Sequence, residues 1–163
     1  MLPNTAAGRF IAEEYRAGDF QLVFRGKTAA IFVEPVDYPG VKRAAEDLQE
    51  DIERVTGQAP EILDTLAGCR EDYVVIIGTL GKSRIIEELA ARGMVDAGSI
   101  RGKWEAHLIQ VVAEPVPGVG CGLVIAGSDQ RGTIYGIYNV SEQIGVSPWY
   151  WWADVPPARK ETL

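Results

Sequence analysis

Residues 73–78 constrain the fold most, because they form an apolar run that is rich in β-branched side chains. Such a run is typical of a central strand that is buried on both faces of a sheet. It is far shorter than the ~20 apolar residues that a membrane-spanning helix needs. The segment after it, 83–93, places its apolar residues on one helical face and stops at Gly93. The sequence therefore predicts a strand followed by a helix that packs on a sheet.

The other elements follow from the same patterns. Residues 38–57 carry one apolar helical stripe, with Pro39 in the first turn and Gly57 at the end. Most carboxylates lie on the opposite, solvated face of this helix, at Glu46, Asp47, Glu50, Asp51 and Glu53. A last helix is expected from Ser128 or Asp129 to near Gly145. Further strands are expected at 20–24, 29–33, 61–63, 106–113 and 122–126, the first two joined by a hairpin turn at 25–27.

The order of these elements is neither a strict βαβ alternation nor an all-β pattern. It predicts an α+β fold with two layers, in which three helices pack on a mixed sheet of about six strands. Gly132 and Gly136 lie on one face of the last helix, where each is unfavourable for helix formation. We expect a close approach of this helix to the sheet to compensate.

Charge and composition exclude several classes of partner and site. The 163 residues include 16 Lys and Arg against 23 Asp and Glu, a net charge of −7 that argues against nucleic-acid or anionic membrane partners. Cys69 and Cys121 are too few and too far apart for a zinc site or a disulfide framework, and His107 is the single histidine. We expect no metal and no cofactor. The chain as given carries no secretory signal, which leaves its compartment open.

Asp129 and Arg131 are candidate ligand contacts, since they follow a strand at a helix start, where sheet proteins often bind ligands. The alternative is that Asp129 caps the helix and pairs with Arg131. Residues 78–83 resemble a phosphate-binding loop, but their spacing is two residues too short. A tight turn, in which Ser83 caps the following helix, is the favoured interpretation there.

The aromatic cluster of Trp149, Tyr150, Trp151 and Trp152 holds three of the four tryptophans. Aromatic rings can stack on sugars, form domain interfaces or complete a core. Because the cluster precedes a polar, proline-containing tail, an interface with something C-terminal is favoured. The predicted organisation is an N-terminal extension at 1–18, a domain at 19–155, and a linker at 156–163.

Residues 127–155 resemble the end of the N-terminal domain of glycoside hydrolase family 115, the xylan α-1,2-glucuronidases, and 76–83 and 102–106 are similar to the same region. The resemblance covers most of 20–157, with Asn139 where many relatives have Asp. It implies a hexosaminidase domain 2-like accessory domain, followed in the whole enzyme by a (β/α)8 barrel. The family removes 4-O-methylglucuronic acid from xylan, and its acid and base carboxylates would belong to the barrel.

Two hypotheses follow. In the first, the chain is the non-catalytic N-terminal domain of a xylan α-1,2-(4-O-methyl)glucuronidase and supports the absent barrel, its partner in the same polypeptide. It would then have no catalytic residue and no activity alone. In the second, it is a stand-alone module that binds carbohydrate or protein through the Trp149–Trp152 cluster. Xylan-derived acidic oligosaccharides and self-association through the aromatic patch are further expected interactions.

Overall fold

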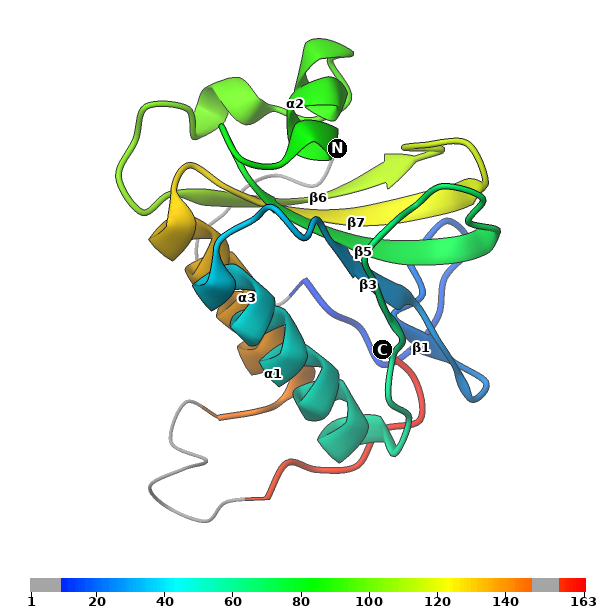
Figure 1. The fold of residues 1–163 in the computed structure, drawn as a ribbon. Helices are drawn as coiled ribbons and strands as arrows, with labels where there is room; N and C mark the ends of the chain where they lie inside the picture. The colour runs from blue at the N-terminus through cyan, green and yellow to red at the C-terminus, as the bar shows by residue number, and fades with distance from the viewer. Residues whose placement is uncertain (1–9, 148–155) are drawn as a thin grey trace.

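A computed structural model describes residues 10–147 and 156–163 of the chain, and its core is a five-stranded sheet of order β4-β3-β5-β7-β6 (Figure 1). Strands β4, β3, β5 and β7 run parallel to one another, whereas β6 runs antiparallel to β7. A separate antiparallel hairpin, β1 with β2, lies beside it. The strands are β1 (Val23–Phe24), β2 (Lys27–Thr28), β3 (Ala30–Val33), β4 (Ile62–Leu63), β5 (Glu71–Thr79), β6 (His107–Ala113) and β7 (Val119–Gly127).

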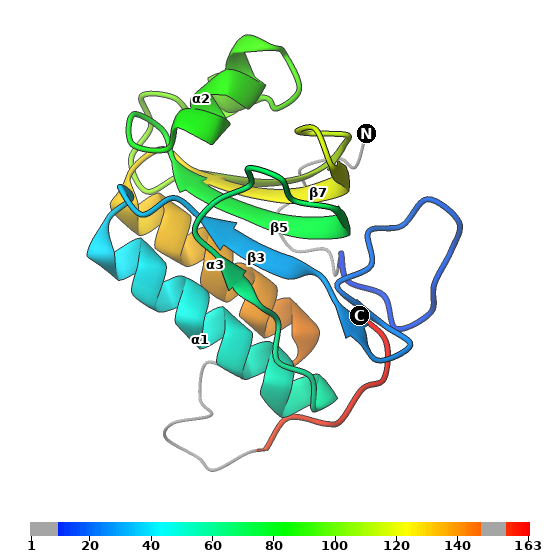
Figure 2. The same cartoon turned by 45° about the vertical axis from the view of Figure 1, so that its right-hand side comes forward.

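The helices cover both faces of this sheet (Figures 1 and 2). Helices α1 (Pro39–Thr56) and α3 (Gln130–Ile144) lie side by side on one face. Helix α2 (Arg84–Ala91) and the short 3-10 helix η1 (Ala97–Ser99) lie on the other. Strand β5 serves both cores: Val75 and Ile77 pack towards α1 and α3, while Val74 and Ile76 pack towards α2. The expected central strand, buried on both faces, is confirmed.

The predicted α+β fold, with a mixed sheet and three helices, is confirmed, and the structure changes two details. The helices form layers on both faces instead of one, because the central strands are apolar on both sides. The predicted strand 29–33 corresponds to the wholly buried β3, which pairs with β4 and β5 instead of with the first strand. The hairpin partner of β1 is the short β2, whose Lys27 lies in the predicted turn. The expected six strands are therefore five in the main sheet and two in the hairpin.

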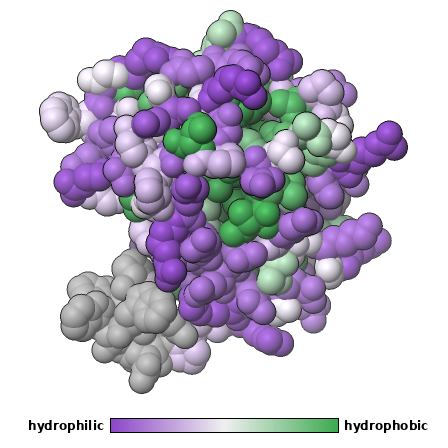
Figure 3. Space-filling view, in the orientation of Figure 1, coloured by the Kyte–Doolittle hydropathy of each residue, from purple (hydrophilic) through white to green (hydrophobic). Residues whose placement is uncertain are grey.

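Helix α1 has the predicted bounds and ends at Gly57, whose φ of 77° fits the left-handed cap position. Its outward surface is hydrophilic in the space-filling view (Figure 3). Asp51 departs from the predicted solvated face, because its side chain is buried and pairs with Arg54 at 2.7 Å. Burial raises the pKa of Asp51, while the hydrogen bond and charge of Arg54 oppose that rise.

Helix α3 approaches the sheet through its two glycines, as predicted. A Cβ atom at Gly132 would collide with the carbonyl oxygen of Ala106, which immediately precedes β6. A Cβ at Gly136 would lie 2.9 Å from Cγ2 of Ile125 on β7. Neither position accepts a side chain without movement of the helix, so contact with the sheet compensates the poor helix propensity of glycine.

The tail predicted as a linker, residues 156–163, packs against the domain in the structure (Figure 1). Leu163 is buried in the core and exchanges two backbone hydrogen bonds with Val23, at 2.9 and 3.0 Å. The Lys160 N–H donates to the carbonyl of Val55 at 2.9 Å, and its ammonium group pairs with Glu13. We call residues 156–163 the strap. No helix in the described ranges has the length and apolar character to cross a bilayer.

Replacing Gly132 with alanine should lower the free energy of unfolding by about 1–3 kcal/mol, the usual cost of overpacking a close contact. Helix propensity alone would raise it by ~1 kcal/mol. Urea denaturation distinguishes these outcomes, with Gly98→Ala as the control, since a Cβ at Gly98 would meet only Asp96 Oδ1 at 3.7 Å. A Gly132→Ala protein as stable as the parent would contradict the close approach.

Replacing Leu163 with alanine should lower the free energy of unfolding by about 2 kcal/mol, because the side chain leaves a packed core. The control is Glu161→Ala on the same strap, an exposed position where little change is expected. Thermal and chemical denaturation measure both. Equal stability of the two variants would mean that the strap behaves as a free linker.

Candidate functional site

One edge of the sheet gathers most of the polar side chains that sequence analysis singled out. The parallel strands β3, β5 and β7 end there, and β6 begins there, since His107 pairs with Gly127. Four loops therefore meet at this edge: 34–38, 80–83, 100–106 and 128–129. The carboxyl ends of parallel strands are the usual place for ligand contacts in such sheets. We call this the carboxyl edge.

Asp129 is the N-cap of α3, and both of its carboxylate oxygens accept backbone hydrogen bonds. Oδ1 accepts from the N–H of Gly132 at 2.8 Å, and Oδ2 accepts from the N–H of Glu105 at 2.9 Å. These two donors hold the pKa of Asp129 below its usual value, because they stabilise the charged form. The expected capping by Asp129 is confirmed, and the carboxylate also fastens the loop before β6 to the start of α3.

Arg131 pairs with Glu105 instead of the predicted partner Asp129, because the Asp129 oxygens face the backbone donors. Its guanidinium lies 2.8 Å from Glu105 Oε1 and donates to the hydroxyl of Tyr135 at 2.7 Å. The same group lies 5.7 Å from the centroid of the Tyr135 ring. The arginine is exposed on the surface, so its flat face and the tyrosine ring are accessible to a partner.

Trp104, next to Glu105, is the functional candidate that sequence reasoning missed. Its side chain is 90% exposed, the largest exposed fraction among the large hydrophobic residues that the structure describes. The available signal was a lone tryptophan between Lys103 and Glu105, in a segment noted only for its family resemblance. Periodicity gives no weight to such a residue, because it lies in a loop.

Beneath this surface, a buried polar network joins the first of these loops to β5 and α3. Asp37, 3% exposed, accepts from both the N–H and the hydroxyl of Thr79 at 2.9 Å. The hydroxyls of Thr79 and Thr133 lie 2.7 Å apart. These bonds tie the loop after β3 to the end of β5 and to the first turn of α3. The carboxylate of Asp37 is therefore part of the framework of the carboxyl edge.

The start of α2 already holds carboxylates of its own chain. Ser83 caps the helix, as expected, and donates its hydroxyl hydrogen to Glu34 Oε2 at 2.7 Å. The same Glu34 oxygen accepts from the N–H of Ile85, while the N–H of Gly81 donates to Glu87. A phosphate would have to displace these groups, so the structure favours the tight-turn interpretation over nucleotide binding. Lys82 lies over the ring of Tyr38, 5.0 Å from its centroid.

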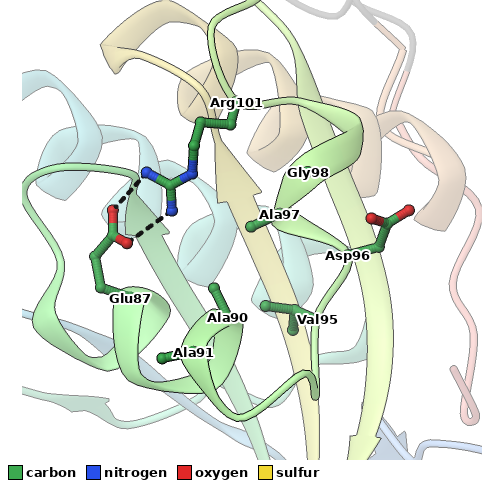
Figure 4. Close-up of a pocket in the computed structure, with 8 residues that line it drawn as sticks. All are labelled: Glu87, Ala90, Ala91, Val95, Asp96, Ala97, Gly98 and Arg101. Carbon is green, nitrogen blue, oxygen red and sulfur yellow. Dashed lines mark hydrogen bonds and ion pairs between the residues drawn. The ribbon is translucent and has the colours of Figure 1, made fainter.

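A shallow hollow of about 330 Å³ lies between α2 and η1 (Figure 4). Figure 4 shows Glu87 and Arg101 facing each other at one end, and Asp96 turned away from them. The ion pair has contacts of 2.7 and 3.3 Å and lowers the pKa of Glu87. Alanines and Val95 form much of the remaining lining. A carboxylate and a guanidinium that neutralise each other in an open hollow offer no group for covalent or acid–base chemistry.

The other predicted candidates form no catalytic or metal site among the residues that the structure describes. His107 is half-buried beside the amide of Asn139 at 3.3 Å, and burial lowers the pKa of its ring. No cluster of three His, Cys, Asp or Glu residues suits a metal ion within residues 10–147 and 156–163. Trp149, Tyr150, Trp151 and Trp152 lie outside the described residues.

Comparison with solved structures shows that this chain is similar to part of a larger enzyme. The chain matches no family model and no curated protein. Among solved structures, it is similar to BtGH115A, a family GH115 4-O-methyl-α-glucuronidase with specificity for decorated arabinogalactans. The TM-score is 0.72 and the sequence identity 34%, over 89% of this chain and 17% of that one. The resemblance to the N-terminal domain of family GH115 is therefore confirmed, and the chain spans about a sixth of that relative's length.

Asp129 should contribute to stability mainly as a charged cap. Because its pKa is lowered in the folded protein, its contribution is present above the unfolded pKa, near 3.9, and is lost as the pH falls through the folded value. At pH 7, Asp129→Ala should cost about 1–2 kcal/mol of unfolding free energy.

Urea denaturation of Asp129→Ala and Asp129→Asn at pH 7 and below pH 3 tests this. The asparagine retains one acceptor oxygen and should cost less at pH 7. The difference between the parent and the asparagine variant should shrink in acid. A difference of the same size at both pH values would show that the charge of Asp129 plays no part.

Proposed function

We propose that the chain is an accessory domain of a glycoside hydrolase of the 4-O-methyl-α-glucuronidase type, packed on a catalytic (β/α)8 barrel outside this sequence. One observation carries the proposal: 89% of this chain matches only 17% of a GH115 enzyme at 34% identity. Most of this chain thus corresponds to a minor part of the much longer BtGH115A.

The chemistry of the carboxyl edge supports a role without catalysis. Glycosidases use two carboxyl groups about 5–10 Å apart, on either side of a sugar in a cleft. Here the carboxylates of Glu34, Asp37 and Asp129 accept hydrogen bonds from their own chain, and these bonds hold the loops together. Each of them is engaged in the framework of the domain, so the acid and base are expected on the barrel.

Our proposal for the substrate concerns the sugar that is removed, and not the polysaccharide that carries it. The relative is a 4-O-methyl-α-glucuronidase named for decorated arabinogalactans, whereas the sequence resemblance indicated xylan. Both polysaccharides can carry 4-O-methylglucuronic acid, so we propose that the whole enzyme releases this acid from a decorated glycan. Xylan stays a prediction for the backbone of that glycan.

A domain exchange tests the proposed role. The matching part of BtGH115A is replaced by residues 10–163 of this chain, and release of 4-O-methylglucuronic acid from decorated arabinogalactan is measured. We expect the exchanged enzyme to retain activity within about tenfold of the parent, a loss of ~1.4 kcal/mol in transition-state stabilisation. We expect BtGH115A without the matching part to lose activity or solubility.

Two controls define the outcome. This chain alone, in the same assay, should release no acid, and release by the isolated chain would show that it is itself catalytic. A folded exchanged enzyme with no activity, or a fully active enzyme without the matching part, would contradict the supporting role. In that case, binding of xylan-derived acidic oligosaccharides by the isolated chain would become the leading hypothesis.

A further inference from the structure

We propose that the exposed group of Trp104, Arg131 and Tyr135, here the Trp104 surface, is the place where this domain docks on the catalytic part of the longer polypeptide. The inference rests on the proposed function and adds the contact surface to it. In Figure 1, the loop that carries residue 104 stands off the body of the domain, beside the start of α3.

The exposure of these aromatic side chains is the first observation. Trp104 is 90% exposed and Tyr135 41%, although both have large apolar rings. Isolated surface hydrophobics are common, but tryptophan is highly buried on average, so one that is exposed almost completely calls for an explanation such as an interaction site. Arg131 contacts Tyr135 and also Glu105, the residue that follows Trp104, so the two exposed rings lie on neighbouring segments of the carboxyl edge.

The loop is also held in place before any partner binds. Glu105 has a φ of 52°, an uncommon value for a residue with a side chain, and its N–H is bonded to Asp129. On the next residue, the N–H of Ala106 donates to Ser128 Oγ at 3.0 Å and its carbonyl accepts from the Ser128 N–H at 2.8 Å. These bonds hold the backbone of Glu105 in this uncommon conformation. A surface ordered in advance loses less conformational freedom on binding.

The residue types favour a protein partner. Trp, Tyr and Arg are the residues that dominate the energy of protein interfaces, near their centres. Glu105 neutralises Arg131 at 2.8 Å, so a partner that covers the pair does not bury a lone charge. The hollow between α2 and η1 and another by the β6–β7 turn are lined by other residues.

The size of the relative identifies the partner. More than four fifths of BtGH115A lies outside the part that this chain matches. Under the proposed function, a domain of 163 residues in such a polypeptide packs on the larger remainder, and a standard interface takes ~800 Å² from each side. The most exposed aromatic residue of the described chain is the natural centre of that contact.

Hydroxyl-radical footprinting with mass spectrometry tests the Trp104 surface. The oxidation rate of Trp104 is measured in the isolated chain and in the exchanged BtGH115A described above. We expect at least a fivefold slower rate in the exchanged enzyme. Tyr15, 45% exposed and packed on Phe24 of the hairpin, is the internal reference and should be oxidised equally in both proteins.

Variants separate docking from folding. Trp104→Ala should leave the thermal midpoint of the isolated chain unchanged, because its side chain is exposed. In the exchanged enzyme, the same change should lower the thermal midpoint and the activity, while Trp104→Phe should restore most of both. A drop of the midpoint in the isolated chain as well would overturn the proposal, since Trp104 would then act within the domain.

The remaining outcomes are distinct. An active exchanged enzyme in which Trp104 is oxidised as fast as in the isolated chain overturns the docking surface and leaves the proposed function intact. A folded but inactive exchanged enzyme with unprotected Trp104 overturns both. Protection of Trp104 in the isolated chain by xylan-derived acidic oligosaccharides, or by raising the protein concentration, would assign the surface to a glycan or to self-association and overturn the proposal.

Discussion

The close contact between α3 and the sheet is the constraint on which the carboxyl edge depends. Gly132 brings the helix backbone against the carbonyl of Ala106, and Asp129 bonds to the N–H of Glu105 one residue earlier. The same turn of the helix carries Thr133, which reaches the buried Thr79 and Asp37. A wider separation would break the contacts of Asp129, Gly132 and Thr133 together, because all three residues lie at the N-cap and first turn of α3.

Sequence patterns were sufficient to predict the elements whose buried residues recur at regular spacing along the chain. The apolar stripe of α1, the double-sided β5 and the glycines of α3 all follow from periodicity and side-chain size. They were insufficient where a contact is made between distant residues. Nothing local assigns residues 30–33 to the main sheet instead of the hairpin, since that choice depends on β4 and β5 pairing with β3.

The candidate site shows the same division. Asp129 could be predicted as a cap, because capping is a local property, but its second bond to Glu105 needs residues 24 positions apart to meet. Arg131 was assigned to the wrong partner for that reason. Trp104 has no periodic signal at all, and its exposure becomes visible only when the loop before β6 is placed. Sites built from loops that converge at a sheet edge therefore need the fold before their members can be identified.

The strap has a consequence for synthesis of the chain. Val23, near the beginning, exchanges hydrogen bonds with Leu163, so the first hairpin gains its third segment only when residue 163 has left the ribosome. Contacts this distant in sequence form late, because the intervening chain must first be closed. The sheet and helices in between can assemble earlier, with part of their core still open. The hairpin and the part of the core around Leu163 are therefore completed last, after the other described elements of the domain have been synthesised.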